Sequence, residues 1–326
     1  MKLILAGATG QIGRMLLRDL AGERDASHEL IMLTRATKSL PAETRLPGVR
    51  VITWDARSLG PWADEIDGAD AVINLAGRSV NCRHTKTNLA EMLSSRVEST
   101  RVIGEAIARA KQPPRVWLQM STATIYAHRF DAPNDDMTGI LGGSEPDAPR
   151  YWDKSIEIAR AWEETLFASP TPRTRKVALR AAMVMSPDRS GVFDTLARLA
   201  QRGLGGAHGS GRQYVSWIHE YDFVAAIRFL LAHEELSGPV NLSSPEPLTN
   251  HAFQQILRHA LLAPFGLRSP EWLLKIGAFF LRTDVELLLK SRRVIPRRLL
   301  EAGFRFRYPD WPSAAIALAS RRAVSK

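Results

Sequence analysis

The chain has 326 residues, of which 45% are hydrophobic and 24% are charged, a composition typical of a globular protein with a sizeable core. Its net charge is +10, but the sequence has no zinc-finger spacing, RNP motif or basic heptad, so we predict no nucleic-acid partner. The single cysteine excludes an internal disulfide, and with no secretory leader before the first apolar segment it predicts a cytoplasmic protein.

Arginine carries most of the positive charge. We interpret it as a solvated basic surface together with a few arginines for a phosphate-bearing ligand. The two basic clusters, at 291–293 and 320–326, are short and fit this interpretation.

Apolar segments and helical patterns alternate along the first 185 residues. The first apolar segment ends in a glycine, as buried parallel strands often do, and a helical pattern follows it. Strands are predicted at 2–7, 29–35, 49–55, 69–77, 114–126 and 175–185, and helices at 11–23, 88–110 and 154–168. This alternation predicts an α/β fold with a Rossmann-type doubly wound parallel sheet covered on both faces.

The pattern changes after Pro187. A helix is predicted at 191–206, a strand and then a helix capped by Asp222 at 212–236, and a short strand at 238–244. Charged residues interrupt the apolar stretch at 271–289, so no membrane span is predicted. We predict a dinucleotide-binding domain at 1–185, to which 214–245 returns, and a smaller, mostly helical C-terminal substrate lobe at 186–213 and 246–326.

Three glycines, at positions 7, 10 and 13, lie where the first predicted strand passes into the first predicted helix. Gly7 permits a tight turn, Gly10 lets the backbone approach a pyrophosphate, and Gly13 lets the helix pack closely on the strand. The helix N-terminus then offers its N–H groups to the phosphates, so Gln11 and Ile12 join the predicted cofactor contacts. A purely structural turn is the alternative.

The spacing G-x-x-G-x-x-G, with Thr9 inside it, resembles the short-chain dehydrogenase/reductase superfamily and in particular its extended branch. "NLAG" at 74–77 is similar to the motif that follows the fourth strand, and "STATIYA" at 121–127 to a segment of sugar-nucleotide epimerases. The resemblance implies further cofactor contacts from Asp55 near the adenine and from Leu75, Ala76, Gly77, Arg96 and Met120. For Arg96, an ion pair that supports a loop is the alternative.

The second strand ends in Thr34 and Arg35, without the carboxylate that usually binds the ribose 2′-hydroxyl of NAD. A guanidinium at this place would offer charge-assisted donors to a 2′-phosphate, and Arg14 and Lys38 lie near in sequence. We therefore predict NADP rather than NAD. Stacking of Arg35 on the adenine is the other possibility.

The resemblance also implies a hydroxyl residue, a tyrosine and a lysine as catalytic groups. Thr122 takes the hydroxyl position and Tyr151 the tyrosine position. The lysine should follow the tyrosine by four residues, but Ser155 stands there and Lys154 comes one place early. A step of one residue turns a side chain by about 100° around a helix, so Lys154 is either a displaced helper or a surface lysine.

Segments along nearly the whole chain, from "INLAGRSV" to "RVIPRRLLEAGFRFRYPDW", resemble atypical epimerase-like reductases of the extended branch, often labelled nucleoside-diphosphate-sugar epimerases and carrying a C-terminal domain of unknown function. This implies an NADP-dependent oxidoreductase or epimerase that acts on an unidentified small carbonyl, hydroxyl or sugar-nucleotide substrate. An NADP(H)-sensing or partner-binding module without turnover is the alternative. The chain is predicted to be a monomer or a homodimer.

Candidate substrate contacts come from the strand ends and from the segment that turns toward the C-terminal lobe. They are Arg180, Gln213, Trp217 and His219. A structural histidine is the alternative for His219, and a loop-supporting ion pair is the alternative for Arg180. The histidines show no metal-ligand spacing, so we predict no metal site.

Overall fold

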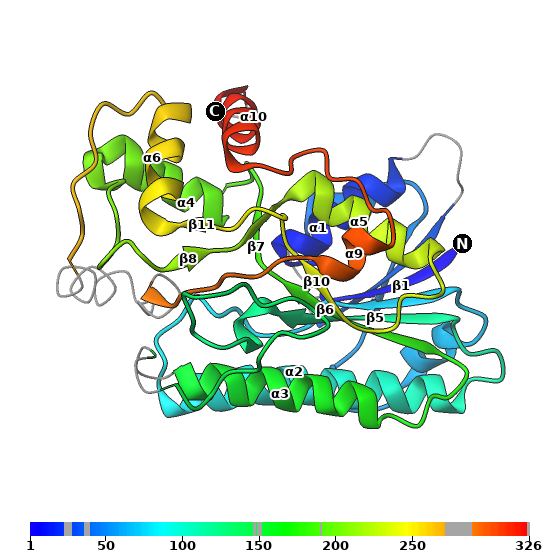
Figure 1. Cartoon of the computed structure of the whole chain (residues 1–326). Helices are drawn as coiled ribbons and strands as arrows, with labels where there is room; N and C mark the ends of the chain where they lie inside the picture. Colours follow the sequence, from blue (N-terminus) through cyan, green and yellow to red (C-terminus); the bar gives the residue numbers. More distant parts are fainter. Residues whose placement is uncertain are drawn as a thin grey trace.

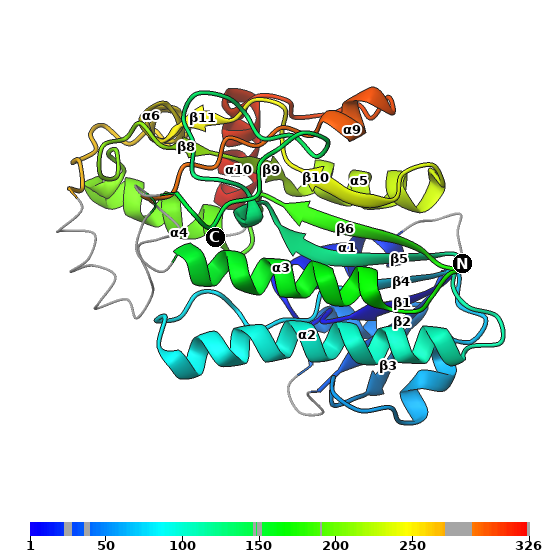
Figure 2. The same cartoon turned by 60° about the horizontal axis from the view of Figure 1, so that its bottom comes forward.

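In the computed structural model, a central parallel sheet carries helices on both faces, and a smaller, mainly helical part packs near the carboxyl ends of its strands (Figures 1 and 2). The structure describes residues 1–22, 28–35, 40–145, 148, 152–189, 191–270 and 289–324. The α/β fold class predicted from the alternating elements is confirmed.

Seven strands form the main sheet in the order β10-β6-β5-β4-β1-β2-β3, and every pair in it is parallel. The order reverses at β1, which lies between β4 and β2, so a crevice opens beyond the carboxyl ends of β1 and β4. The strands are β1 (Lys2–Ala6), β2 (Glu29–Thr34), β3 (Val49–Thr53), β4 (Ala71–Asn74), β5 (Val116–Thr122), β6 (Arg175–Ala181) and β10 (Gly238–Leu242).

Helices cover both faces of this sheet, which explains why its inner strands contain unbroken apolar runs, such as residues 3–6 in β1 and 30–33 in β2. Leu3 and Leu5 point into the cluster formed with α1 (Gln11–Ala21) and α5 (Glu220–Ala232). Ile4 and Ala6 point into the opposite cluster, beside α2 (Lys86–Arg109) and α3 (Trp152–Ala168). Figure 2 shows the two helix pairs on opposite sides of the sheet.

The smaller part is built around an aromatic cluster. Trp311 stacks on Phe253 at 4.1 Å between ring centroids and lies 4.9 Å from Trp217. Its elements are β7 (Met183–Met185), α4 (Val192–Leu199), the π-helical turn η4 (Ala200–Leu204), β8 (Tyr214–Val215), β9 (Trp217–His219), β11 (Leu248–Thr249), α6 (Asn250–Ala260) and α10 (Trp311–Val324). The short helix α9 (Arg297–Glu301) packs on β10 instead, and its Leu299 belongs to the core of the main sheet. Short 3-10 turns complete the chain at η1 (Ala42–Arg45), η2 (Pro61–Ile66) and η3 (Ala123–Ile125). The exact domain limits stay a prediction.

The helix α5 begins differently from the sequence prediction. His219, not Asp222, is its N-cap, and the His219 Nδ1 accepts a hydrogen bond from the Tyr221 backbone N–H at 3.0 Å. Asp222 lies in the first turn, where its carboxylate accepts hydrogen bonds from the backbone N–H groups of Arg307 and Tyr308. The predicted cap was wrong because a distant segment, which local spacing does not reveal, uses this carboxylate.

A buried polar network joins the sheet to α3. Arg180 on β6 donates two hydrogen bonds to Glu163, at 2.9 and 2.7 Å, and one to the Tyr126 hydroxyl at 2.9 Å. Ser121 donates to Glu163 at 2.6 Å, and Tyr126 donates to Asn241 on β10 at 2.9 Å. Every member has a partner, which is the condition under which buried polar groups stabilise a fold.

We expect Arg180→Met to lower the free energy of unfolding by about 3–5 kcal/mol, because it leaves the Glu163 carboxylate buried without its cation. The matched control is Arg50→Met, which breaks an exposed pair with Glu65 and should cost at most about 1 kcal/mol. Urea unfolding of both variants measures the difference. Equal losses would contradict the structural role given to the buried pair.

Candidate active site

The turn between β1 and α1 lies against the end of β4. Gly7 has φ +76°, and a Cβ placed on it would lie 2.7 Å from the backbone of Leu75 and Ala76. A Cβ on Gly13 would overlap the Cα of Ala8. Both glycines are therefore required by the packing of this chain itself.

Gly10 differs from the other two glycines. A Cβ on it would meet only the carbonyl oxygen of Gly7, at an ordinary contact distance of 3.5 Å. Gly10 is the N-cap of α1, and this helix has no side-chain cap and no acidic residue in its first turn. The partial positive charge of the helix N-terminus is thus left to a group outside the chain.

Two buried nitrogen atoms on the first turn of α1 have no hydrogen-bond partner among the described residues. They are Nε2 of Gln11 and Nε of Arg14. Buried donors in native structures are nearly always satisfied, so both fit a ligand that supplies oxygen atoms. Of the other residues predicted to contact the cofactor, Thr9 is exposed in the turn before α1, and Ile12 lies in the first turn of α1.

The end of β2 lies beside the end of β3, because Thr34 pairs with Thr53. Thr34 is buried, and Arg35 is exposed directly after it. Lys38 lies outside the described residues. The arrangement brings the Arg35 position to the same edge of the sheet as the glycine turn.

Asp55 follows β3 and organises a turn. Hydrogen bonds from the side chain and the backbone of Ser58, and from the backbone of Arg57, lower the pKa of Asp55 to about 2. The residue is exposed and ionised at neutral pH, so it is an acceptor with a fixed orientation.

Arg96 on α2 lies against the segment that follows β4. A Cβ on Gly77 would come within 3.3 Å of its side chain, and its guanidinium donates to the carbonyl oxygen of Met92 at 2.9 Å. Burial lowers the pKa of Arg96 to about 10, and no carboxylate pairs with it in the described part of the chain. The loop-supporting ion pair considered for Arg96 is thus absent among these residues.

Thr122 ends β5, next to the crevice, and its hydroxyl accepts a hydrogen bond from the Thr124 backbone N–H at 3.1 Å. Met120, two residues earlier, is buried in the core. Tyr151 lies outside the described residues. Lys154 is half-exposed and donates to both carboxylate oxygens of Glu157, at 2.8 and 2.9 Å.

A different lysine occupies the end of β5. Lys290 is 1% exposed, and its ammonium donates to the carbonyl oxygens of Thr124, at 3.1 Å, and of Tyr126. It also lies over the ring of Trp152, the first residue of α3. Sequence reasoning missed Lys290, because nothing local shows that residues 166 positions apart meet.

Arg292, in the short basic cluster at 291–293, is buried, with only 6% of the residue exposed. The backbone around it is held by hydrogen bonds to Tyr214 and Ser216, which draw the segment into the protein.

The candidate substrate residues are buried and have partners within the protein. Gln213 donates to the carbonyl oxygen of His208 at 2.9 Å, Trp217 is fully buried in the aromatic cluster, and Arg180 belongs to the ion-paired network. Burial, with the charges of Arg321 and Arg307, lowers the pKa of His219 to about 3, so the ring is neutral. Their contact with a substrate stays a prediction.

Tyr126, the other phenol near the site, is committed to the buried network. Burial raises the pKa of Tyr126 to about 12, so its hydroxyl stays protonated at neutral pH. It is therefore a poor proton donor or acceptor for a reaction.

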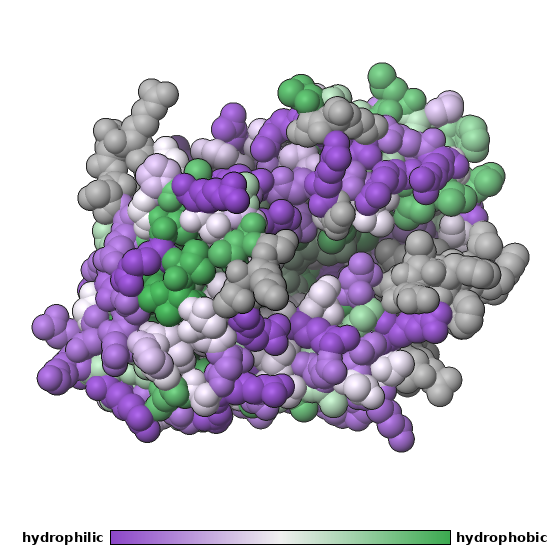
Figure 3. All heavy atoms as spheres, turned by 180° about the vertical axis from the view of Figure 1, so that it is seen from behind, coloured by the Kyte–Doolittle hydropathy of each residue, from purple (hydrophilic) through white to green (hydrophobic). Residues whose placement is uncertain are grey.

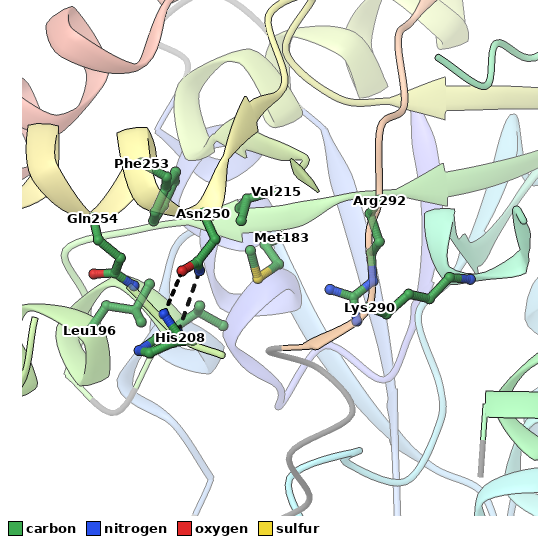
Figure 4. Close-up of a pocket in the computed structure, with 10 residues that line it drawn as sticks. Met183, Leu196, His208, Val215, Asn250, Phe253, Gln254, Lys290 and Arg292 are labelled. Carbon is green, nitrogen blue, oxygen red and sulfur yellow. Dashed lines mark hydrogen bonds between the residues drawn. The ribbon is translucent and has the colours of Figure 1, made fainter. Parts of the chain in front are cut away.

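A cavity opens between the strand ends and the smaller part of the molecule. Figure 3 shows the rear face hollowed near its middle, with hydrophobic residues on the floor and hydrophilic ones around it. Figure 4 shows residues from β7, α4, α6 and the 290–292 segment around a cavity. Its ten lining residues are Met183, Val192, Leu196, His208, Val215, Asn250, Phe253, Gln254, Lys290 and Arg292.

Among the described residues, no group of three His, Cys, Asp or Glu side chains is placed to hold a metal ion. Within the same ranges, no helix has the length and apolar character to cross a bilayer.

The edge of the sheet thus brings together a glycine turn, an uncapped helix and a threonine at the end of β5. The family model of the NAD dependent epimerase/dehydratase family matches residues 3–243. The chain belongs to this family. A second model, a domain of unknown function called DUF1731, matches residues 269–318.

Relatives match over nearly their full length. The chain is 30% identical over 318 residues to the epimerase family protein SDR39U1 of Bos taurus, which covers 96% of this chain and 98% of that protein. It is 27% identical over 327 residues to the epimerase family protein YfhF of Bacillus subtilis, with 99% and 100% covered.

A solved structure agrees with this grouping. The crystal structure of human epimerase family protein SDR39U1 with NADPH matches with a TM-score of 0.81 and 29% identity, covering 98% of this chain and 99% of that one. The resemblance to epimerase-like proteins of the extended branch is confirmed.

Proposed function

We propose that the protein is an NADP(H)-dependent oxidoreductase or epimerase that acts on a small carbonyl, hydroxyl or sugar-nucleotide compound. The observation that carries the proposal is Gly10 at the uncapped N-terminus of α1, because the packing of the chain does not require a glycine there. A glycine at this position allows close approach of a pyrophosphate. The NADPH bound to human SDR39U1 supports this choice of ligand.

The residues present also fit the 2′-phosphate of NADP. Arg35 follows β2 where an NAD site usually has a carboxylate, and the buried Nε of Arg14 lacks a partner in the described structure. Two guanidinium groups near one edge favour a dianionic phosphate over a neutral hydroxyl.

The remaining cofactor contacts are assigned to residues along the same edge. They are Gly7, Thr9, Gln11, Ile12, Gly13, Thr34, Asp55, Leu75, Ala76, Gly77, Arg96 and Met120. Arg96 supplies a cation that no carboxylate in the described structure pairs with, and Asp55 supplies a fixed acceptor.

The nicotinamide supplies hydride transfer when it is bound. The chain then has to hold the substrate oxygen and move one proton. Thr122 holds the oxygen through its hydroxyl, and Tyr151 exchanges the proton. A free tyrosine has a pKa of about 10, so this step needs a nearby positive charge that favours the phenolate.

We assign that charge to Lys290 rather than to Lys154. The ammonium of Lys154 bonds to Glu157 on the exposed side of α3. The ammonium of Lys290 donates to the carbonyl oxygen of Thr124 in η3, the turn that directly follows Thr122. It also lies over the ring of Trp152, the residue after Tyr151 in the chain. The positive charge of Lys290 thus favours the loss of the Tyr151 proton.

A second candidate function is an NADP(H) sensor or partner-binding module without turnover. The observation in its favour is the Lys154–Glu157 pair, which leaves the usual Tyr–Lys arrangement incomplete. The single cysteine supports a reducing, cytoplasmic setting for either function, and a monomer or a homodimer is compatible with both.

One prediction for the proposed function concerns the glycine turn between β1 and α1. Gly10→Ala should raise the Kd for NADPH at least about tenfold, because the added methyl group occupies the space of the pyrophosphate, while the melting temperature stays within about 2 °C. Gly60→Ala, at the N-cap of η2, is the control that should change neither value. NADPH fluorescence and thermal melting measure both. Unchanged binding in a stable Gly10→Ala protein would remove the basis of the proposal.

The second prediction separates an enzyme from a sensor. NADPH consumption is followed with a panel of aldehydes, ketones and quinones. Tyr151→Phe should lower kcat by at least about 10²-fold and leave the Kd for NADPH unchanged, because it removes only the proton that moves. Binding of NADPH with no consumption across the panel would favour the sensor.

The third prediction concerns the charge near the tyrosine. Lys290→Met should move the tyrosine inflection of the pH–rate profile upward by about 1 unit or more, because loss of a nearby cation raises a phenol pKa. Lys290→Arg should restore the profile, and Lys154→Met should leave it unchanged. A profile that moves with Lys154→Met instead would reassign the charge to that lysine.

A further inference from the structure

Helix α6 ends in a Schellman motif whose left-handed position is a leucine. The Leu262 N–H donates to the carbonyl oxygen of His259 at 3.1 Å, which is one of the two hydrogen bonds of this motif. The Ala263 N–H donates to the carbonyl oxygen of Arg258 at 3.0 Å, which is the other. Leu262 therefore has φ +53°, a conformation in which glycine or asparagine is usual and a leucine is strained. It is also 91% exposed, so packing within the described structure does not explain it.

Three more apolar side chains are exposed near this leucine. Phe265 and Leu267, in the loop after α6, are 60% and 61% exposed, and Leu204 in η4 is exposed as well. The loop and η4 are joined, because the Leu267 N–H donates to the carbonyl oxygen of Gly203 at 2.8 Å. A Cβ on Gly203 would lie 2.5 Å from the Phe265 ring, so this ring lies against η4. We call the four side chains, Leu204, Leu262, Phe265 and Leu267, the apolar tip.

The apolar tip projects from one end of the molecule. Figure 1 shows α6 and α4 at the end that lies far from the N-terminus. At the upper right of Figure 3, where α6 lies in that view, hydrophobic side chains stand out from the surface among hydrophilic ones. The tip is thus convex, and it is not a groove that a single side chain would fill.

The surroundings of the apolar tip are basic. Arg202 and Arg268 are exposed, and they lie next to Gly203 and Leu267, the two residues that join η4 to the loop. The two segments that build this region, 195–219 and 250–270, contain five arginines and no aspartate or glutamate. Helix α10, which packs on α6, has no acidic residue either. The region is therefore complementary in charge to an anionic partner.

The apolar tip lies at the far ends of two helices that line the cavity of Figure 4. The first residues of α4 and α6, among them Val192 and Asn250, belong to the cavity lining, whereas η4 and the loop 261–268 follow the last residues of these helices. Helix α6 has 11 residues and is about 16 Å long. A partner bound at the tip therefore leaves the cavity open.

A lipid bilayer fits this combination of features better than a folded protein does. A rigid protein surface would need a matching pocket for each projecting side chain, whereas fluid acyl chains close around any of them. Binding at the boundary of a bilayer increases with the apolar area that enters it and with attraction between cations and anionic lipids. Guanidinium groups also match the geometry of lipid phosphates.

We propose that the apolar tip, together with Arg202 and Arg268, binds the surface of an anionic lipid bilayer. The four apolar side chains enter the boundary between head groups and acyl chains, and the two guanidinium groups contact lipid phosphates. This mode of binding needs no spanning helix, and none is found within the described ranges. It does not depend on the proposed function, because the tip contains none of the predicted cofactor, catalytic or substrate residues.

Co-sedimentation with vesicles tests the proposal. We expect the protein to bind phosphatidylcholine vesicles that contain about one-third phosphatidylglycerol at least about tenfold more tightly than pure phosphatidylcholine vesicles, because each of two arginines gains from the anionic surface. Leu262→Asn should weaken this binding at least about fivefold, since it removes a leucine that enters the bilayer. Its melting temperature should stay the same or rise, because asparagine suits the left-handed conformation. The variant therefore separates loss of binding from loss of folding.

Two controls separate the apolar tip from the general surface. Ile140→Asn removes an apolar side chain that is 55% exposed outside the tip, and it should bind the anionic vesicles within twofold of the parent protein. The double variant Arg202→Gln/Arg268→Gln should weaken binding at least about tenfold. Arg109→Gln/Arg115→Gln removes the same charge from exposed positions near the amino end of β5, and it should stay within twofold.

Three results would overturn the inference. One is the absence of binding to the anionic vesicles, which would leave the apolar tip as a surface for a protein. Another is unchanged binding by Leu262→Asn, which would mean that the leucine does not enter the bilayer. The third is an equal loss in the two arginine double variants, which would mean that only the net positive charge of the protein attracts the vesicles.

Discussion

The close approach of the β1–α1 turn to the end of β4 determines the geometry of the whole site. Gly7 and Gly13 permit this approach because a Cβ on either would collide with backbone atoms. It brings the N-terminus of α1, with its partial positive charge, to the point where the strand order reverses. The groups that follow β2, β4 and β5 then lie at the same edge of the sheet as the N-terminus of α1.

The buried polar groups are of two kinds, those whose hydrogen bonds are satisfied within the protein and those that have no partner among the described residues. Arg180 forms an ion pair with Glu163 and donates a hydrogen bond to the Tyr126 hydroxyl, so these groups already have partners inside the protein. Gln11 and Arg14 keep buried nitrogen atoms without partners in the described structure. The second group lies at the crevice, where a desolvated donor gains most from an incoming oxygen atom.

The C-terminal segment contributes to the site as well as to the smaller core. Ser291 and the backbone of Arg292 tie it to the loop after β5 and to β8. This connection carries Lys290 to the end of β5 and Arg292 to the cavity. The part of the chain that matches a domain of unknown function, residues 269–318, thus includes Lys290 and Arg292, the two buried cations that line the described cavity.

The sequence by itself determined the parallel sheet and the glycine turn, because both follow from short-range spacing of apolar residues and glycines. It also placed Thr122 and Arg35 at strand ends, since the carboxyl ends of parallel strands meet at one edge. Only the tertiary structure decided the cap of α5 and the burial of Lys290 and Arg292. The direction of the His219 side chain decides the first, and contacts between segments far apart in the chain decide the second, so local spacing carries no record of either.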